Sequence, residues 1–182
     1  MTAPAKPELL LKPDEATDHI RGPASARVTL IEYGDFECPS CLQAYTALKV
    51  MLPHFGSQVR FVFRHFPLRE AHPHAELAAE AAEAAGAQGK FWPMYELLFT
   101  HQQHLKEKQL LDYAGQVGLD MPSYQNAMSD HVYLQRVQEH LLGGHHLGVR
   151  STPAFYVNGV LTDVSFGLQH LHEAIEKALA GS

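Results

Sequence analysis

The first third of the chain alternates between strand-like and helix-like patterns of hydrophobic residues. The segment 27–34, RVTLIEYG, is rich in β-branched and aromatic residues, which is typical of a buried strand. The segment 39–55 places apolar residues at helical spacing, and 58–66 predicts a second strand. A helix between two strands predicts a βαβ unit with parallel strands and a right-handed crossover.

The middle of the chain predicts helices in succession. Each segment has apolar residues at helical spacing or a short helix signal, and glycine ends several of them. The predicted helices cover 73–86, 92–102, 107–118, 121–130 and 131–144. A run of helices placed after a βαβ unit indicates a helical subdomain.

Strand patterns return near the end of the chain. Two strand-like segments flank Asn158-Gly159, a dipeptide that strongly favours a two-residue hairpin turn. An amphipathic helix is expected over 168–180. The class is therefore α/β, in the order β-α-β, helices, β-β-α. The expected organisation is an extended N-terminal arm over 1–24, a main domain from 25–68 and 149–182, and a helical insertion over 69–148.

Composition and charge narrow the range of partners. The net charge is −6 and no cluster of lysine and arginine is present, so a nucleic-acid partner is not expected. No apolar run approaches the roughly 18 residues that span a membrane, so no membrane span is expected. The apolar run near the N-terminus, Leu9 to Leu11, is too short for a secretory signal. A cytoplasmic location is expected, or a periplasmic or secreted one if a leader has been removed.

The stretch DFECPSCLQAY contains the two cysteines of the chain, Cys38 and Cys41. A C-x-x-C pair next to a βαβ pattern is a redox signature. A structural disulfide would close a very short loop and add little stability. A structural zinc site usually needs four ligands, and the further ligands would have to come from histidines. The candidates are His72, His74, His145 and His146, although each histidine taken alone is expected to be solvated.

The position of the pair explains why it suits redox chemistry. Cys38 lies where the predicted helix begins, so free backbone N–H groups and the positive end of the helix dipole favour its thiolate. Pro39 suits the first turn, where a missing N–H costs nothing. Cys41 lies one turn further on and is expected to be the less exposed thiol.

Three segments together resemble the DsbA-like thiol–disulfide oxidoreductases. They are EYGDFECPSC, GKFWPMYELLF and VRSTPAFYVNG, and the resemblance covers about residues 25–180. It implies a thioredoxin-like fold with a central mixed sheet, in which the helical segment is an insertion. It also implies protein or small-molecule thiol and disulfide substrates and a redox-recycling partner, with no cofactor and no metal.

The resemblance also implies roles for individual residues. Cys38 resembles the nucleophile that forms a mixed disulfide with the substrate, and Cys41 resembles the resolving thiol. Glu32 would be a buried acid that exchanges a proton with Cys41, which agrees with the raised pKa of buried carboxyl groups. Pro153 would be cis and lie beside the cysteines, and Thr152 would offer backbone hydrogen bonds to a substrate strand.

Ser40 is a departure from the family pattern. Many strongly oxidising members have histidine between the cysteines, and serine carries no charge that would stabilise a thiolate. Because a stabilised thiolate makes the disulfide a stronger oxidant, a weaker oxidant is expected here. Oxidase, reductase and isomerase directions stay open. The alternatives are a metal-binding or chaperone-like module without catalysis, or a redox sensor, on the same fold.

Overall fold

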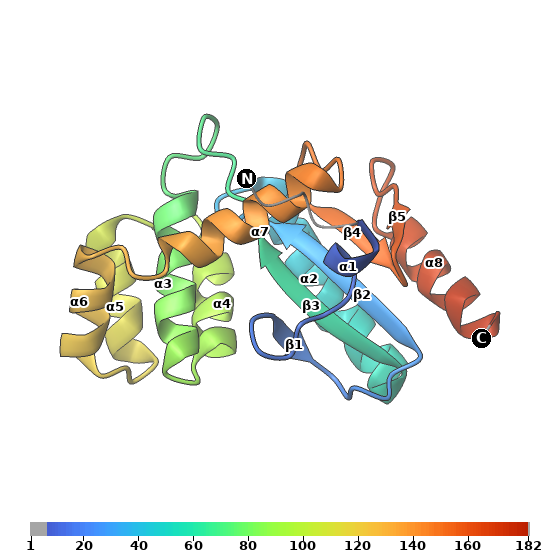
Figure 1. Ribbon diagram of the computed structural model, residues 1–182, viewed down its shortest axis with the longest axis horizontal. Coiled ribbons are helices and arrows are strands. Elements are labelled where there is room, and N and C mark those ends of the chain that lie inside the picture. The colour runs from blue at the N-terminus through green and yellow to red at the C-terminus, as the bar shows by residue number, and fades with distance from the viewer. Residues whose placement is uncertain (1–6, 182) are drawn as a thin grey trace. The chain divides into compact units, whose positions relative to one another are not determined.

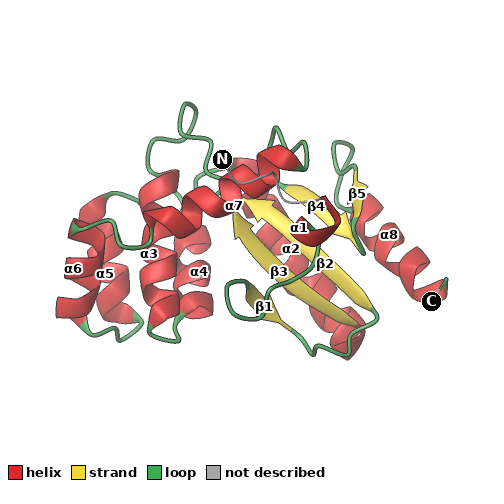
Figure 2. Ribbon diagram, in the orientation of Figure 1, coloured by secondary structure: helices red, strands yellow, loops and turns green. Residues whose placement is uncertain are grey.

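The computed structural model describes residues 7–181. Five strands form a mixed sheet in the order β1-β3-β2-β4-β5 (Figures 1 and 2). The strands are β1 (His19–Arg21), β2 (Val28–Gly34), β3 (Val59–His65), β4 (Ala154–Val157) and β5 (Val160–Thr162). The arrows of β2 and β3 run in the same direction (Figure 1), as the βαβ pattern predicts.

The predicted helices are present, with ends that shift by a few residues. The α-helices are α1 (Pro7–Leu10), α2 (Pro39–Phe55), α3 (Ala75–Ala87), α4 (Phe91–Thr100), α5 (Glu107–Gln116), α6 (Met121–Ser129), α7 (Leu134–His146) and α8 (Gln169–Ala180). A short 3₁₀ helix, η1 (Gly56–Gln58), leads into β3. Over residues 7–181, none of these helices combines the length and the apolar character needed to cross a membrane.

The chain divides into two compact units. We call the first the sheet unit; it contains Met1–Gly34, Gln43–Arg64 and Gly143–Ser182. We call the second the helical unit; it contains Asp35–Leu42 and His65–Leu142. The cysteine segment therefore groups with the helices, whereas the sequence pattern places it with the strands.

The C-terminal strands of the sheet unit form the predicted hairpin. β4 pairs antiparallel with β5, and the turn residues Asn158 and Gly159 have φ values of 46° and 81°. Positive φ at both positions is the geometry of the type I′ turn, which asparagine and glycine favour. The Asn158 side chain also accepts the backbone N–H of Thr29 at 2.8 Å, so the turn is joined to the segment at the start of β2.

The N-terminal segment differs from the predicted extended arm. Part of that prediction, residues 1–6, lies outside the described residues; the rest contains α1 and β1, and β1 pairs antiparallel with β3. The physical reason is Arg64 on β3. Its guanidinium makes two bonds to the Asp18 carboxylate, at 2.7 and 2.8 Å, and donates to the carbonyls of Leu10 and Lys12. This long-range anchor has no periodic signal in the sequence.

In the helical unit, α3 packs against α4, α5 and α6. Its buried face is made of small side chains, which allow neighbouring helices to approach closely. Two glutamates on α3 are buried as well, and each has a histidine partner. Glu80 accepts from His131 at 2.9 Å, and Glu83 lies 2.7 Å from the Nε2 atom of His65.

The Glu80–His131 pair predicts that the helical unit loses stability as the pH rises. Burial raises the pKa of Glu80, and the hydrogen bond to Glu80 raises the pKa of His131 above 6.5. Both groups bind their protons more tightly in the folded than in the unfolded protein. The stability that each group contributes is therefore present at low pH and is lost as the pH rises through its pKa in the folded state. The His131 contribution is therefore lost above 6.5.

Urea unfolding at about pH 6 and about pH 8 measures this effect, since the histidine charge changes within this window. The urea midpoint of the wild-type protein should be lower at the higher pH than at the lower pH. This decrease should be smaller in His131→Gln. Other histidines titrate in the same range, so the difference between the two proteins is the informative quantity. An identical fall in both would contradict the assignment.

Candidate functional site

The two cysteines lie at the start of α2. Cys38 directly precedes the helix and Cys41 lies in its first turn, and the two are not joined by a disulfide. Cys38 is 6% exposed and Cys41 is fully buried, which confirms the expected difference between the two thiols. The Cys38 carbonyl accepts the N–H groups of Cys41 and Leu42, at 3.0 and 3.2 Å. Pro39 and Ser40 are exposed between the cysteines.

Asp35 contacts both cysteines through its backbone. Its carbonyl accepts the N–H of Cys38 at 3.2 Å, and its own N–H donates to the Sγ atom of Cys41 at 3.4 Å. A hydrogen bond donated to sulfur favours the thiolate over the thiol. Asp35 thus fixes the turn that presents Cys38 and also supplies a donor to the buried thiol.

The Asp35 carboxylate is almost fully buried and is surrounded by donors. Oδ1 accepts the N–H of Glu37, and Oδ2 accepts the N–H of Leu68, each at 2.8 Å. The Nδ1 atom of His72 also lies 2.8 Å from Oδ2. A buried carboxylate is stable only when its oxygens have such partners, so these donors explain why Asp35 can be buried at this turn.

His72 carries a charge more readily than an isolated histidine does. Partial burial lowers its pKa, but the hydrogen bond and the charge of Asp35 outweigh that effect. Negative charge on Cys38 and on Glu37 raises the pKa further, so the net shift is upward from 6.5. The interaction of His72 with Cys38 is mutual, so a protonated His72 also favours the thiolate of Cys38.

Glu37, the residue before Cys38, has its own histidine partner. Its carboxylate accepts the backbone N–H of His74 at 2.7 Å and lies 2.8 Å from the Nδ1 atom of the same residue. The acids at positions 35 and 37 are thus each bound by one histidine of the sequence His72-Pro73-His74. Without such partners, two carboxylates would oppose a thiolate beside them.

Gln102 supports the same turn from the segment that follows α4. Its side-chain amide is buried and donates to the carbonyls of Phe36 and Cys38, at 2.9 and 2.8 Å. The Phe36 ring packs against Phe99, also at this end of α4, with a centroid distance of 4.9 Å. The helical unit therefore holds the backbone on both sides of Glu37.

Sequence reasoning missed Asp35 and Gln102 as parts of this site, and it named His72 and His74 only as possible metal ligands. His72 and His74 bind carboxylates although their side chains stay partly exposed, at 17% and 35%. The expectation that each histidine is solvated is wrong for His65 and His140, which are buried and stacked 5.5 Å apart. The one available signal was the pair of histidines two residues apart, followed by a helix, within the proposed insertion.

The remaining candidate residues lie in the sheet unit. Glu32 is fully buried on β2, opposite Phe155 on β4, so it is not an exposed edge residue. The Thr152–Pro153 peptide bond is cis and directly precedes β4. Glu32 therefore lies on β2, and Pro153 lies directly before the neighbouring strand β4. The roles that the resemblance implies for them and for Thr152 stay predictions.

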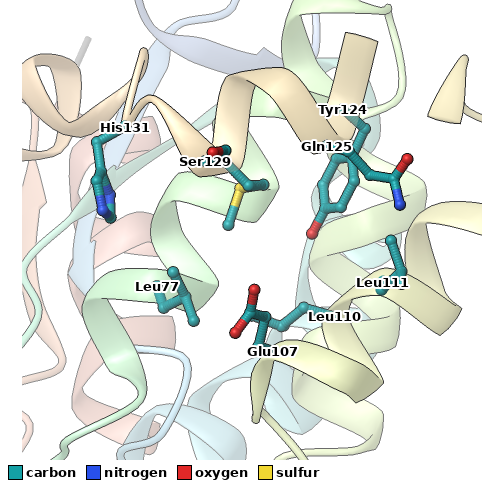
Figure 3. A pocket seen from close by; sticks show the side chains of 9 residues that line it. Leu77, Glu107, Leu110, Leu111, Tyr124, Gln125, Ser129 and His131 are labelled. Atoms are coloured by element: carbon teal, nitrogen blue, oxygen red, sulfur yellow. The ribbon is translucent and has the colours of Figure 1, made fainter. Parts of the chain in front are cut away.

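The helical unit also contains a cavity of about 430 Å³ among α3, α5 and α6 (Figure 3). Leucines form part of its wall, and the Glu107 carboxylate and the Tyr124 hydroxyl point into it from different helices. Burial raises the pKa of Tyr124, and the negative charge of Glu107 adds to the effect. The cavity lining contains no cysteine, so it is separate from the dithiol.

The comparisons with known proteins agree with this geometry. The sequence matches the family described as Thioredoxin over residues 14–177. A relative from Salinispora arenicola, named Na(+)/H(+) antiporter NhaA 1, is 43% identical over 175 residues. That match covers 96% of this chain but 27% of the relative, so the chain spans about a quarter of the length of the curated relatives it matches.

Two solved structures show the same fold. A thioredoxin-like oxidoreductase from Silicibacter pomeroyi has a TM-score of 0.81 and 25% identity, and the match covers 98% of this chain and 100% of that one. Alpha-DsbA1 from Wolbachia pipientis has a TM-score of 0.80 and 18% identity, and the match covers 97% of each chain. The predicted thioredoxin-like fold and its resemblance to DsbA-type proteins are confirmed. The chain belongs to the thioredoxin family.

Proposed function

We propose that the chain is a DsbA-like thiol–disulfide oxidoreductase that acts through Cys38. The observation that carries the proposal is the position of the two thiols. The more exposed Cys38 lies at the N-terminus of α2, and the buried Cys41 lies one turn further on. An attacking thiol needs access and a stabilised thiolate, whereas a resolving thiol needs only to lie close to it.

The exchange proceeds in two steps that balance in atoms and electrons. The Cys38 thiolate attacks one sulfur of a substrate disulfide, which forms a mixed disulfide and releases the other substrate sulfur as a thiolate. The Cys41 thiolate then attacks the Cys38 sulfur, and the second substrate sulfur leaves. The substrate gains two electrons and becomes a dithiol, while the chain becomes a Cys38–Cys41 disulfide. Read backward, the same steps oxidise a substrate dithiol.

The helix start supplies part of the chemistry. The positive end of the helix dipole stabilises negative charge on a sulfur at this place, and such sites lower a cysteine pKa by roughly 1 to 5 units from about 8.5. In the sheet unit, Glu32 is proposed as the acid that exchanges a proton with Cys41. Thr152 and cis-Pro153 are proposed to bind an extended substrate segment through the backbone.

The proposed substrates are disulfides or thiols of proteins or small molecules, and a further redox protein or thiol would recycle the pair. The curated relatives are longer proteins, so we propose this activity for the part they share with the chain and do not extend the antiporter name to it. Ser40 adds no positive charge between the cysteines, which by itself favours a weaker oxidant than members with histidine at that place. A reductase or thiol-repair role in the cytoplasm is proposed on that ground.

Insulin reduction tests the proposal directly. With dithiothreitol as the electron source, the wild-type chain should accelerate the reduction of insulin disulfides, and Cys38→Ser should reduce the rate to that of dithiothreitol alone. Val50→Ser is a matched control, because Val50 lies on the same helix and is 76% exposed; it should keep the wild-type rate. Equal activity in Cys38→Ser would overturn the proposal.

The same preparation separates this proposal from the metal-binding alternative. Metal analysis of the protein purified under reducing conditions should give much less than one equivalent of zinc. One equivalent of zinc that is lost in Cys41→Ser, together with no acceleration of insulin reduction, would support a metal-binding module instead.

A further inference from the structure

We propose that His72, held by Asp35, supplies the positive charge that stabilises the Cys38 thiolate in this chain. The inference rests on the proposed function, because it concerns the same nucleophile. In other members a histidine between the cysteines has this effect, but this chain has Ser40 at that place. The proposal assigns the effect to His72, which lies outside the C-x-x-C segment.

Geometry places the imidazole at the cysteine turn. The Nδ1 atom of His72 lies 2.8 Å from the Asp35 carboxylate, and the carbonyl of Asp35 accepts the N–H of Cys38. His72 and Cys38 are thus bound to the same residue, one through its side chain and the other through its backbone. The Asp35 side chain is completely buried, whereas the His72 side chain is 17% exposed, so solvent protons reach the imidazole.

The hydrogen bond to Asp35 determines which nitrogen of His72 carries a proton. An ionised carboxylate accepts from Nδ1–H, so this nitrogen is protonated in both charge states of the ring. A second proton on Nε2 makes the ring cationic, and the neighbouring Asp35 carboxylate favours that state. Asp35 therefore positions His72 and raises its pKa above 6.5, so the ring stays charged to a higher pH than an isolated histidine does.

Asp35, Glu37 and Cys38 each raise the pKa of the His72 imidazole. The Glu37 carboxylate is bound by His74, and the Asp35 carboxylate is bound by two backbone N–H groups as well as by His72. Because both carboxylates already have other donors, a protonated His72 can also interact with a negative sulfur on Cys38.

The test measures the Cys38 thiolate itself. The rate at which iodoacetamide alkylates Cys38 is followed across pH in a Cys41→Ser background, where one thiol reports. An opposite charge within a few ångströms shifts a pKa by about 1 to 3 units. His72→Gln, which is neutral, should move the alkylation midpoint up by about one unit, and His72→Lys should stay close to the starting midpoint. If the role of His72 were purely structural, His72→Lys should raise the alkylation midpoint as well.

His131→Gln is the matched control, because His131 also binds a buried carboxylate in the helical unit. It should leave the midpoint unchanged. An unchanged or lowered midpoint in His72→Gln, an equal shift in His131→Gln, or a raised midpoint in His72→Lys would each overturn the proposal. If His72→Gln does not fold, as judged by circular dichroism, the His72→Lys midpoint still decides.

A second readout uses the intact pair. With both cysteines present, His72→Gln should shift the equilibrium constant with glutathione about tenfold toward the disulfide form of the chain, which corresponds to about 30 mV. Wild-type insulin reduction that depends on Cys38, together with an unchanged midpoint in His72→Gln, would overturn the role of His72 alone. Insulin reduction that does not depend on Cys38 would overturn the proposed function instead.

Discussion

A variant in which serine replaces Cys41 is expected to attack a substrate disulfide once and then remain joined to it. Cys41 is the thiol that completes the exchange, and it lies in the same helical turn, so its attack on the mixed disulfide is intramolecular. Loss of such an intramolecular partner should lower insulin-reduction turnover by on the order of a hundredfold or more. The mixed disulfide should accumulate until its amount equals that of the protein.

Mass spectrometry after incubation with a disulfide-containing peptide measures this accumulation. The adduct should map to Cys38 and disappear on addition of dithiothreitol. The Cys38→Ser variant is the matched control, because its remaining thiol is fully buried and should form little adduct. The assigned roles would be contradicted if Cys41 in Cys38→Ser formed as much adduct as Cys38 forms in Cys41→Ser.

The Asp18→Ala variant is expected to lose about 3–5 kcal/mol of stability, because it removes one partner of a buried ion pair. The Asp18 and Arg64 side chains are 2% and 8% exposed, and two hydrogen bonds join them. Burial lowers the pKa of Arg64, but the hydrogen bonds and charges of Asp18 and Tyr33 together outweigh it, so the net shift of the pKa is upward. Without Asp18 the guanidinium would be buried with no carboxylate.

Urea unfolding measures the loss, and an exposed ion pair in the same unit provides the control. Arg60 binds Glu15 at 3.0 Å, but the Glu15 side chain is 67% exposed. Exposed pairs contribute about 0–1 kcal/mol, so Glu15→Ala should change the unfolding midpoint little. Equal effects of Asp18→Ala and Glu15→Ala would show that the N-terminal segment is not anchored through Arg64.

Local patterns in the sequence predicted the framework of the sheet unit. The residues of α2 have helical periodicity, and Asn158-Gly159 can adopt the positive φ values of a tight hairpin. These features depend on neighbours in the chain, so composition and spacing reveal them. The positions of Cys38 and Cys41 at the helix start follow from the same local signals.

The surroundings of Cys38 depend on contacts between residues far apart in the sequence. His72 reaches Asp35 across 37 residues, and Gln102 reaches the Cys38 carbonyl across 64. Neither residue lies in a periodic pattern that marks it as functional. The start of α7 also depends on a contact with a residue far away in the sequence. His131 has a φ of 50° and binds Glu80, and α7 begins only at Leu134.

Cys38 and Cys41 are proposed to cycle between a dithiol and a disulfide. Equilibration of the protein with mixtures of reduced and oxidised glutathione, followed by alkylation and mass spectrometry, counts the thiols at each ratio. Both thiols should disappear together in one reversible two-electron transition. Two thiols that persist across all ratios, or glutathione adducts in place of an intramolecular disulfide, would contradict it.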